Sequence, residues 1–250
     1  MHYNWRWGIF FQGSTNPGER WIDYLVAGLG WTIATALAAW VIALAIGAVV
    51  GTLRTTSKRW VVLLGDAYVE VFRNVPLLVQ MFLWFFVVPE LLPAALGDWI
   101  KQMAPPWGSY IPAVLCLGLY TSVRVAEQTK AGIQSLPSGQ RMAGTAMGLT
   151  QWETYRYVIL PQSFRIILPP LTSEFMNIIK NSSVALTIGL MELTGRARAM
   201  QEFSFQVFEA YAAATVIYML TNLVVVLGMR WLESSVRVPG LIAADGPQAH

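Results

Sequence analysis

The feature that most constrains the fold is an uncharged stretch of thirty residues, 24–53. A helix needs about 20 apolar residues to cross the hydrocarbon core of a bilayer, so this stretch can span one. Further apolar stretches cover roughly residues 60–92, 111–133, 164–193 and 210–231. Backbone groups inside a bilayer have no water to bind, and helices satisfy these groups internally. The sequence therefore predicts an all-α, polytopic membrane protein with about five transmembrane helices.

Composition agrees with this class and excludes several kinds of active centre. Hydrophobic residues make up 55% of the 250 residues and charged residues 12%, whereas soluble domains carry about a quarter charged residues. One cysteine, Cys116, and two histidines, His2 and His250, are too few for a haem, zinc or iron–sulfur centre or a Ser–His protease. A G-x-x-x-x-G-K-[ST] phosphate loop is absent, so we expect no ATP hydrolysis by this chain. We accordingly expect no catalytic residue, no metal and no cofactor.

Several residues inside the apolar stretches predict packing or a break. Small residues recur at every fourth position of the first span, at Ala39, Ala43, Gly47 and Gly51. Such a stripe permits close helix contact, and we expect bundle packing within the chain rather than a dimer seam. Cys116 is expected to be a small buried hydrophobic residue. The fourth stretch is expected to break at Pro169–Pro170, and residues 90–112 are expected to form a loop.

Residues 60–92 are apolar but are interrupted by charged residues and by Pro76. We expect one kinked or broken helical segment, because Pro76 frees backbone groups that neighbours must satisfy. Three charged residues share one helical face, which we expect to turn inward: Asp66, Glu70 and Arg73.

The distribution of basic residues predicts the orientation. With five spans, nine lysines and arginines fall on one side of the membrane and five on the other, and the richer side is normally cytoplasmic. Residues 1–23 then form an extracytoplasmic segment, and residues 234–250 form a cytoplasmic tail. The membrane domain covers residues 24–233, and its loop 134–163 faces the cytoplasm. The net charge of +3 is modest, and we expect no nucleic acid partner.

Within that loop, residues 139–161 carry the pattern of two short helices joined at an elbow. Ala143 lies in the first helix, and Gly148 supplies the bend. Thr150 and Glu153 fit a capping box, in which each side chain binds the backbone amide of the other residue. The dipeptide Leu160–Pro161 is expected to end the second helix, because proline disfavours the helical conformation of its predecessor.

The second helix of the elbow presents an apolar face outside the bilayer. The residues at helical spacing are Leu149, Trp152, Tyr155 and Ile159. Such a face needs a protein partner or the lipid surface. Glu153 and the small number of basic residues suit anionic lipid poorly, so we favour a protein groove with Trp152 and Tyr155 as anchors.

Polar residues at membrane depth are costly and indicate functional sites. The sharpest cluster follows Pro169–Pro170, and a weaker one lies near Pro76. The candidates for lining a substrate path are Arg73, Asn74, Glu174, Asn177, Lys180 and Asn181. The alternatives are a structural Glu174–Lys180 pair or a helix start at the water interface.

The loop also resembles that of the permease subunits of ABC importers, which reads E-A-A, three residues, Gly, nine residues, then I-x-L-P. The matching segments are Met142-Ala143-Gly144, Gly148 and Val158-Ile159-Leu160-Pro161. Met142 replaces the glutamate and Gly144 the second alanine. Other stretches resemble the polar amino acid branch of this family: 69–82, 132–140, 160–174 and 179–189. The stretches 4–10, 88–93 and 116–128 are most similar to permeases of glutamate/aspartate importers.

The resemblance implies a permease subunit in the bacterial cytoplasmic (inner) membrane that imports a polar amino acid, glutamate or aspartate first, by alternating access. The implied partners are an ABC ATPase dimer that binds the ATP, a second permease subunit (identical or a sister), an extracytoplasmic solute-binding protein and membrane lipid. The resemblance assigns coupling to the ATPase to these residues: Ala143, Gly148, Thr150, Trp152, Glu153, Tyr155, Leu160 and Pro161. The alternatives are a stand-alone secondary transporter or channel for small polar solutes, and an inner-membrane enzyme or scaffold.

Overall fold

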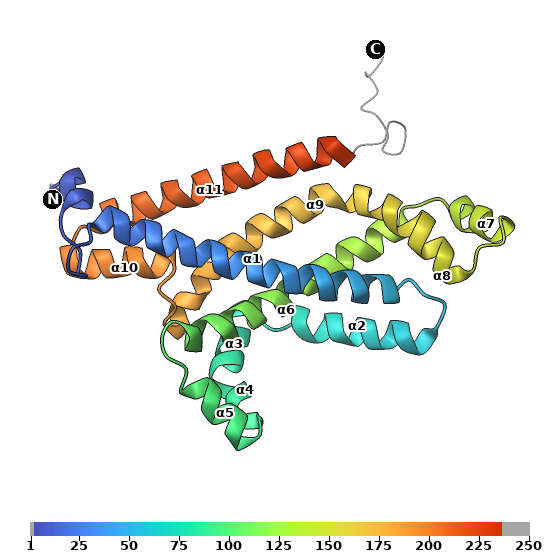
Figure 1. Cartoon of the computed structure of the whole chain (residues 1–250), viewed down its shortest axis with the longest axis horizontal. Helices are drawn as coiled ribbons and strands as arrows, with labels where there is room; N and C mark the ends of the chain where they lie inside the picture. Colours follow the sequence, from blue (N-terminus) through green and yellow to red (C-terminus); the bar gives the residue numbers. More distant parts are fainter. Residues whose placement is uncertain (1–2, 237–250) are drawn as a thin grey trace, which may run out of the picture.

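The computed structural model describes residues 3–236, and these residues are predominantly helical (Figure 1). No strand occurs among them; one isolated bridge joins Gly13 and Arg20. The α-helices are α1 (Trp21–Leu53), α2 (Arg59–Arg73), α3 (Leu77–Phe82), α4 (Val88–Leu91), α5 (Ala94–Lys101), α6 (Trp107–Gln134), α7 (Ser138–Ala146), α8 (Gln151–Thr154), α9 (Leu160–Asn181), α10 (Leu193–Ser204) and α11 (Val207–Val236). Two 3-10 segments, η1 (Trp7–Phe11) and η4 (Ser182–Ile188), and two π-helical segments, η2 (Leu83–Val87) and η3 (Tyr155–Ile159), complete them. The predicted all-α class is confirmed, and the predicted tail beyond residue 236 lies outside the described residues.

Three of the described helices are long and apolar enough to cross a membrane, namely α1, α6 and α11. A fourth span results if α2 and the segment from α3 to α4 are taken together. The predicted number of five is therefore not reached by length and composition alone. The difference lies in α9, whose 22 residues include three prolines and several polar side chains.

The segment expected to be kinked or broken is broken, because α2 and the segment Leu77–Leu91 meet at 96°. Asn74 ends α2, and Pro76 precedes α3 with an extended ψ of 142°. The side-chain amide of Gln80 donates through Nε2 to the carbonyl oxygens of Phe72 (2.7 Å) and Val75 (2.9 Å). A neighbouring side chain thus satisfies backbone groups freed at the break, as a membrane requires.

The small-residue stripe of α1 packs against α6. Ala39, Ala43, Gly47 and Gly51 are all buried. A Cβ added at Gly47 would lie 2.5 Å from Cβ of Val125, and one added at Gly51 would lie 2.6 Å from the carbonyl oxygen of Ala126. The predicted bundle packing within the chain is confirmed, and the missing side chains allow this close approach.

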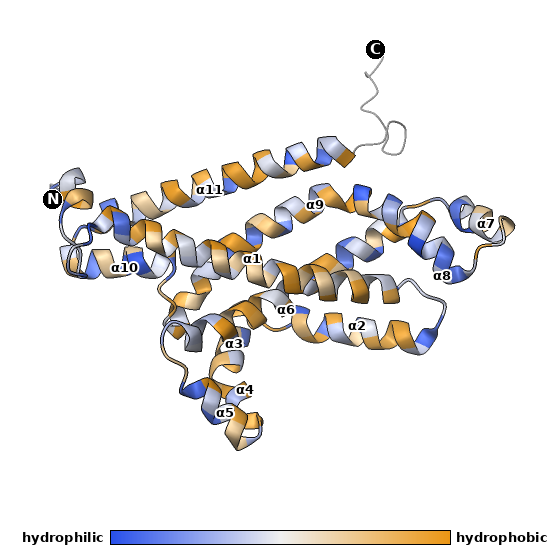
Figure 2. Cartoon of the chain, viewed as in Figure 1, coloured by the Kyte–Doolittle hydropathy of each residue, from blue (hydrophilic) through white to orange (hydrophobic). Residues whose placement is uncertain are grey.

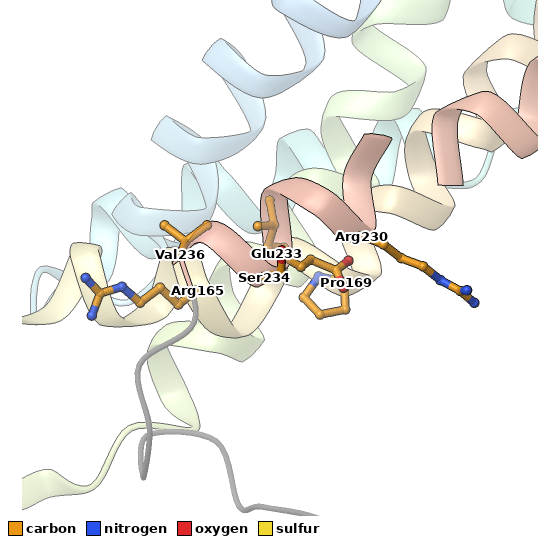
Figure 3. A pocket seen from close by; sticks show the side chains of 7 residues that line it. Arg165, Pro169, Arg230, Glu233, Ser234 and Val236 are labelled. Atoms are coloured by element: carbon orange, nitrogen blue, oxygen red, sulfur yellow. The ribbon is translucent and has the colours of Figure 1, made fainter. Parts of the chain in front are cut away.

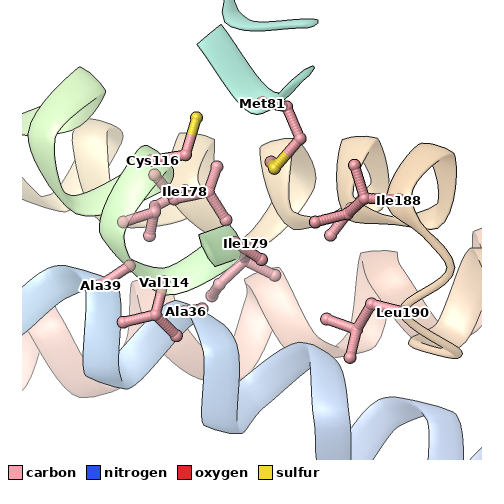
Figure 4. Packing of buried hydrophobic residues seen from close by; sticks show 12 residues of the cluster. Ala36, Ala39, Met81, Val114, Cys116, Ile178, Ile179, Ile188 and Leu190 are labelled. Carbon is pink, nitrogen blue, oxygen red and sulfur yellow. The ribbon is translucent and has the colours of Figure 1, made fainter. Parts of the chain in front are cut away.

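The main core lies where α1, α3, α6 and the end of α9 converge (Figure 4). Ala36 and Ala39 of α1 face Met81 of α3 and Ile178 of α9 across the cluster. Cys116 of α6 is fully buried there, as predicted. Apolar residues also cover much of the outside, and α11 is apolar along most of its length (Figure 2). Such surfaces suit lipid or neighbouring membrane subunits.

Two predictions of this kind are wrong. Residues 90–112 do not form a loop throughout, because α5 forms within them and α6 begins at Trp107. Helix α9 continues through Pro169–Pro170, a sequence that neighbouring groups can accommodate in membrane helices. The chain turns instead after η4, where Gly189 takes a left-handed φ of 85° that suits glycine.

Candidate functional site

The elbow expected in the loop is present as α7, Gly148 and α8, at the end of the molecule where α1 and α11 also end (Figure 1). Helix α7 closes in a Schellman motif. The amide of Gly148 donates to the carbonyl oxygen of Thr145 (3.0 Å), and that of Leu149 to Gly144 (3.1 Å). Gly148 takes a φ of 79°, which confirms the predicted bend. Its conformation suits glycine because a side chain there would be strained.

The predicted capping box at the start of α8 is confirmed. The Glu153 amide donates to Oγ1 of Thr150 (3.3 Å), and the Thr150 amide donates to Oε2 of Glu153 (2.8 Å). The Thr150 hydroxyl donates to the same carboxylate at 2.7 Å. This hydroxyl and then the backbone amide hold the pKa of the Glu153 carboxyl below its usual value. The box therefore fixes the direction in which α8 leaves the elbow.

The structure separates the two expected aromatic anchors. Trp152 is 68% exposed, whereas Tyr155 is 7% exposed and its hydroxyl donates to the carbonyl oxygen of Thr55 (2.9 Å). Tyr155 thus holds the elbow against the turn that follows α1, and only Trp152 is available to a partner. The expected single apolar face is therefore divided: Trp152 is exposed, whereas Tyr155 and Ile159 are buried.

The expected end of the second helix at Leu160–Pro161 is wrong, because α9 begins there and continues to Asn181. Proline fits the first turn of a helix, where an amide donor is not needed within the helix. The remaining coupling candidates differ in exposure: Ala143 and Gly148 are exposed, as is Pro161, and Leu160 is half-buried. The elbow is therefore a continuous, cap-stabilised lead into α9.

A network of ion pairs lies beside the elbow. Arg54, at the end of α1, is buried; its Nε binds Asp66 of α2 at 2.7 Å, and its Nη1 binds Glu127 of α6 at 2.9 Å. Lys130 reaches Asp66 at 3.6 Å. Asp66 thus faces inward as predicted, but Glu70 is exposed and pairs with Asn74. The network joins α1, α2 and α6. It lies next to the contact between Tyr155 and Thr55, because Thr55 follows Arg54 directly.

The expected substrate-path residues do not form one site. Arg73 and Asn74 are exposed at the break between α2 and α3. Glu174 is buried and lies 3.8 Å from Arg124 of α6, so its ion-pair partner is Arg124 and not Lys180. Lys180 is exposed and lines a groove of about 740 Å³ against α11. Asn177 and Asn181 are half-buried on α9.

The same groove contains residues that sequence reasoning missed. Tyr218 and Asn222 of α11 line it, and Glu192 lies behind Tyr218 without any exposed surface. The Glu192 carboxylate accepts from the amides of Thr194 (3.0 Å) and Gly195 (2.8 Å) at the start of α10, and from the Tyr218 hydroxyl (2.9 Å). The only sequence signal was an isolated glutamate at the end of an apolar stretch.

A second cleft, of about 350 Å³, lies between the ends of α9 and α11 (Figure 3). Arg165 and Arg230 border it but point to opposite sides, with Glu233 and Pro169 between them. Glu233 accepts a hydrogen bond from Thr172 at 3.2 Å. The cleft therefore offers no convergent set of cationic groups.

The helical bundle has an elbow at one end and a groove with a few polar groups along α11. These features fit a membrane transport subunit, and the comparisons agree. Residues 43–238 match the family model described as binding-protein-dependent transport system inner membrane component. The chain belongs to this family. Proteins of the family work with an ATPase and a substrate-binding protein, so the alternatives of a stand-alone transporter, channel, enzyme or scaffold are set aside.

Individual relatives narrow the similarity. The chain is 45% identical to the glutamate/aspartate import permease protein GltJ of Escherichia coli (strain K12), over 96% of this chain and 98% of the relative. It is 32% identical to the probable glutamine ABC transporter permease protein GlnM of Bacillus subtilis, over 79% and 88%. A crystal structure of an amino acid ABC transporter with histidines has a TM-score of 0.72 and 29% identity, over 86% and 95%. The MetNI methionine ABC transporter, with a TM-score of 0.71 and 16% identity, shares the fold.

Proposed function

We propose that this chain is the permease subunit of an ATP-driven importer for glutamate and aspartate. The 45% identity to GltJ over nearly the whole of both chains supports this substrate class. Lys180 in the groove against α11 is a cation suited to an acidic amino acid. In this proposal Lys180 and its neighbours in the groove contact substrate, whereas the Glu174–Arg124 pair holds α9 against α6.

The observation that carries the coupling role is the capped elbow that leaves the Trp152 side chain exposed. Gly148 and the capping box fix α8, and Tyr155 ties it to the turn after α1. Trp152 then presents an exposed indole that fits a groove on another protein. Residues 134–163 act as the contact with a partner ATPase dimer, which binds and hydrolyses the ATP.

The proposed topology places the N-terminus outside and the C-terminus in the cytoplasm. Helices α1, α6 and α11, the bent pair and α9 supply five crossings. The ends of α1 and α11 and the elbow lie together at one end of the molecule (Figure 1). Of the nine basic residues of the expected cytoplasmic side, the eight within residues 3–236 belong to these segments and their neighbours. Positive charge normally faces the cytoplasm. A solute-binding protein would dock at the opposite end, and a second permease subunit would complete the path.

The proposed mechanism follows from the connections of the elbow. Movement of α8 by the ATPase is passed to α9 through η3 and to α1 through the Tyr155–Thr55 contact. The Arg54 network extends this connection to α2 and α6. The bundle then alternates between outward and inward access by rigid-body movement.

Transport by the reconstituted complex tests this function. Proteoliposomes that contain the permease, its ATPase and its binding protein should accumulate radiolabelled glutamate and aspartate when ATP is supplied on the ATPase side. Glutamine in excess should compete poorly. Uptake of acidic amino acids without ATP, or ATP-driven uptake of glutamine in preference to glutamate, would contradict the proposal.

A further inference from the structure

The groove along α11 combines apolar walls with a few polar groups. It has a volume of about 740 Å³ and lies between α11 and the segment from Lys180 to Thr194. Its polar lining includes Lys180, Thr194, Tyr218 and Asn222, and the apolar lining includes Leu223 and Val226. Among the described residues, Lys180 is the one charged side chain that lines this groove. Ligand sites typically have this composition, in which few polar groups fix the orientation.

Glu192 makes the Tyr218 hydroxyl an acceptor towards the groove. A carboxylate can only accept, so in the 2.9 Å contact the single hydroxyl proton of Tyr218 points to Glu192. In the 3.0 Å contact between the hydroxyls of Thr194 and Tyr218, Thr194 must therefore be the donor. A hydroxyl oxygen has two acceptor positions, and Thr194 occupies one. Because Tyr218 lines the groove, we assign the second position to a donor there.

Asn222 adds another acceptor one helical turn further along α11. Its Nδ2 donates to the carbonyl oxygen of Tyr218 at 2.9 Å. Its Oδ1 is buried and has no hydrogen-bond partner within the described residues. Buried polar atoms are normally paired. An unpaired acceptor on the lining of a groove indicates a place for a donor from a ligand.

Lys180 supplies the complementary chemistry. It forms no ion pair within residues 3–236, and its ammonium group carries three donors and no acceptor. The groove therefore presents a cationic donor on the α9 side and oxygen acceptors on the α11 side. An amino acid carries carboxylates that suit the first and an ammonium group that suits the second.

We propose that this groove binds an acidic amino acid in transit. Its side-chain carboxylate binds Lys180, and its α-ammonium group binds Tyr218 and Asn222. Glu192 is a positioning residue that holds the Tyr218 hydroxyl in the accepting orientation. The inference rests on the proposed function and adds the site and the groups that recognise the ammonium. A second permease subunit would close the open side of the groove.

Direct binding to the assembled permease–ATPase complex tests the site. The complex is placed in lipid nanodiscs without nucleotide and without binding protein, and the probe is radiolabelled glutamate. Glutarate, which lacks the ammonium group, and glutamine, which lacks the side-chain carboxylate, serve as competitors. We expect each to bind at least about tenfold more weakly than glutamate, because each loses a charged hydrogen bond.

Variants assign the two ends of the ligand. Tyr218→Phe, Asn222→Leu and Glu192→Gln should weaken glutamate binding about tenfold and leave glutarate binding unchanged. Lys180→Gln should weaken both ligands. Thr215→Val is the matched control, because Thr215 also lines the groove but its hydroxyl donates to the carbonyl oxygen of Tyr211 at 2.7 Å.

The result separates this inference from the proposed function. Complex elution and stimulation of ATP hydrolysis by the binding protein check that each variant is assembled. Equal losses of affinity for glutamate and for glutarate in Tyr218→Phe would overturn the assignment of the ammonium group to Tyr218. Absence of glutamate binding by a wild-type complex that still imports glutamate would overturn the site and leave the importer function standing.

Discussion

At the scale of single residues, Gly47 and Gly51 determine how closely α1 and α6 approach. A Cβ at either position would fall within 2.6 Å of atoms of α6. Movement of a flexible side chain cannot relieve these close contacts. Gly51 faces a backbone carbonyl, and Gly47 faces both Val125 and the carbonyl oxygen of Ser122. The distance between the two helices is therefore set by the absence of side chains.

Replacing Gly47 by valine should separate α1 from α6. Overpacking of a well-packed interface costs about 1–3 kcal/mol, and about 5 °C of thermal stability is a reasonable expectation for a chain of this size. Gly30→Val is the control in the same helix, since a Cβ at Gly30 meets nothing within 4 Å. Thermal unfolding in detergent compares the two. Equal melting temperatures for Gly47→Val and Gly30→Val would contradict the packing described for α1.

Single residues also show which features could be predicted from sequence. The stripe of small residues and the Thr150–Glu153 box follow from local spacing, so both were predictable. The burial of Tyr155 was not, because its partner Thr55 is a hundred residues away in sequence. Glu192 was missed for the same reason, because its hydrogen-bond partners include Thr32 and Tyr218, which lie in other helices.

At the scale of elements, α8 depends on its cap. A helix of four residues with a π-helical continuation has few internal hydrogen bonds, so the capping box contributes much of its definition. Sequence reasoning placed the elbow correctly but ended it at Pro161. A proline in the first turn of α9 and one inside it look alike in sequence, and only packing decides whether the helix continues.

The cap should weaken as pH falls. The folded pKa of Glu153 lies below its unfolded value, so its contribution is present above the unfolded pKa, about 4.3, and is lost as pH falls through the folded pKa. Hydrogen exchange over residues 150–155, corrected for the intrinsic rate, should show this loss in the wild type. Thr150→Ala should lower protection about fivefold at neutral pH and should remove most of the pH response. Thr145→Ala, an exposed neighbour outside the box, is the control; the same response in Thr150→Ala as in the wild type would refute the role of the box.

At the scale of the whole molecule, the end with the elbow and the end with the N-terminus are proposed to lie on opposite sides of the membrane. The proposed topology puts Thr15 outside the cell and Ser138 inside, both at exposed positions. In a background without Cys116, which is buried, a cysteine at position 15 should react with an impermeant maleimide in spheroplasts. A cysteine at position 138 should react only in inside-out vesicles. Labelling of both positions from one side would disprove the odd number of crossings proposed between residues 15 and 138.

The number of crossings was the part of the architecture that composition could not decide. Helix α9 is long enough to span a bilayer, but it carries Glu174, Asn177 and Lys180 together with two internal prolines, so its hydropathy does not identify a span. Its polar groups are instead distributed by packing, with Glu174 towards Arg124 and Lys180 towards the groove.

The elbow at Gly148 is proposed to couple transport to a partner ATPase. The most direct measurement is the ratio of glutamate uptake to ATP hydrolysis in proteoliposomes, for the wild type, Gly148→Pro and Gly148→Asn. Proline cannot adopt the φ of 79° seen at Gly148, whereas asparagine tolerates the left-handed region. We predict that Gly148→Pro inserts and assembles but loses uptake relative to hydrolysis, and that Gly148→Asn stays near the wild-type ratio. An unchanged ratio in Gly148→Pro would contradict the account.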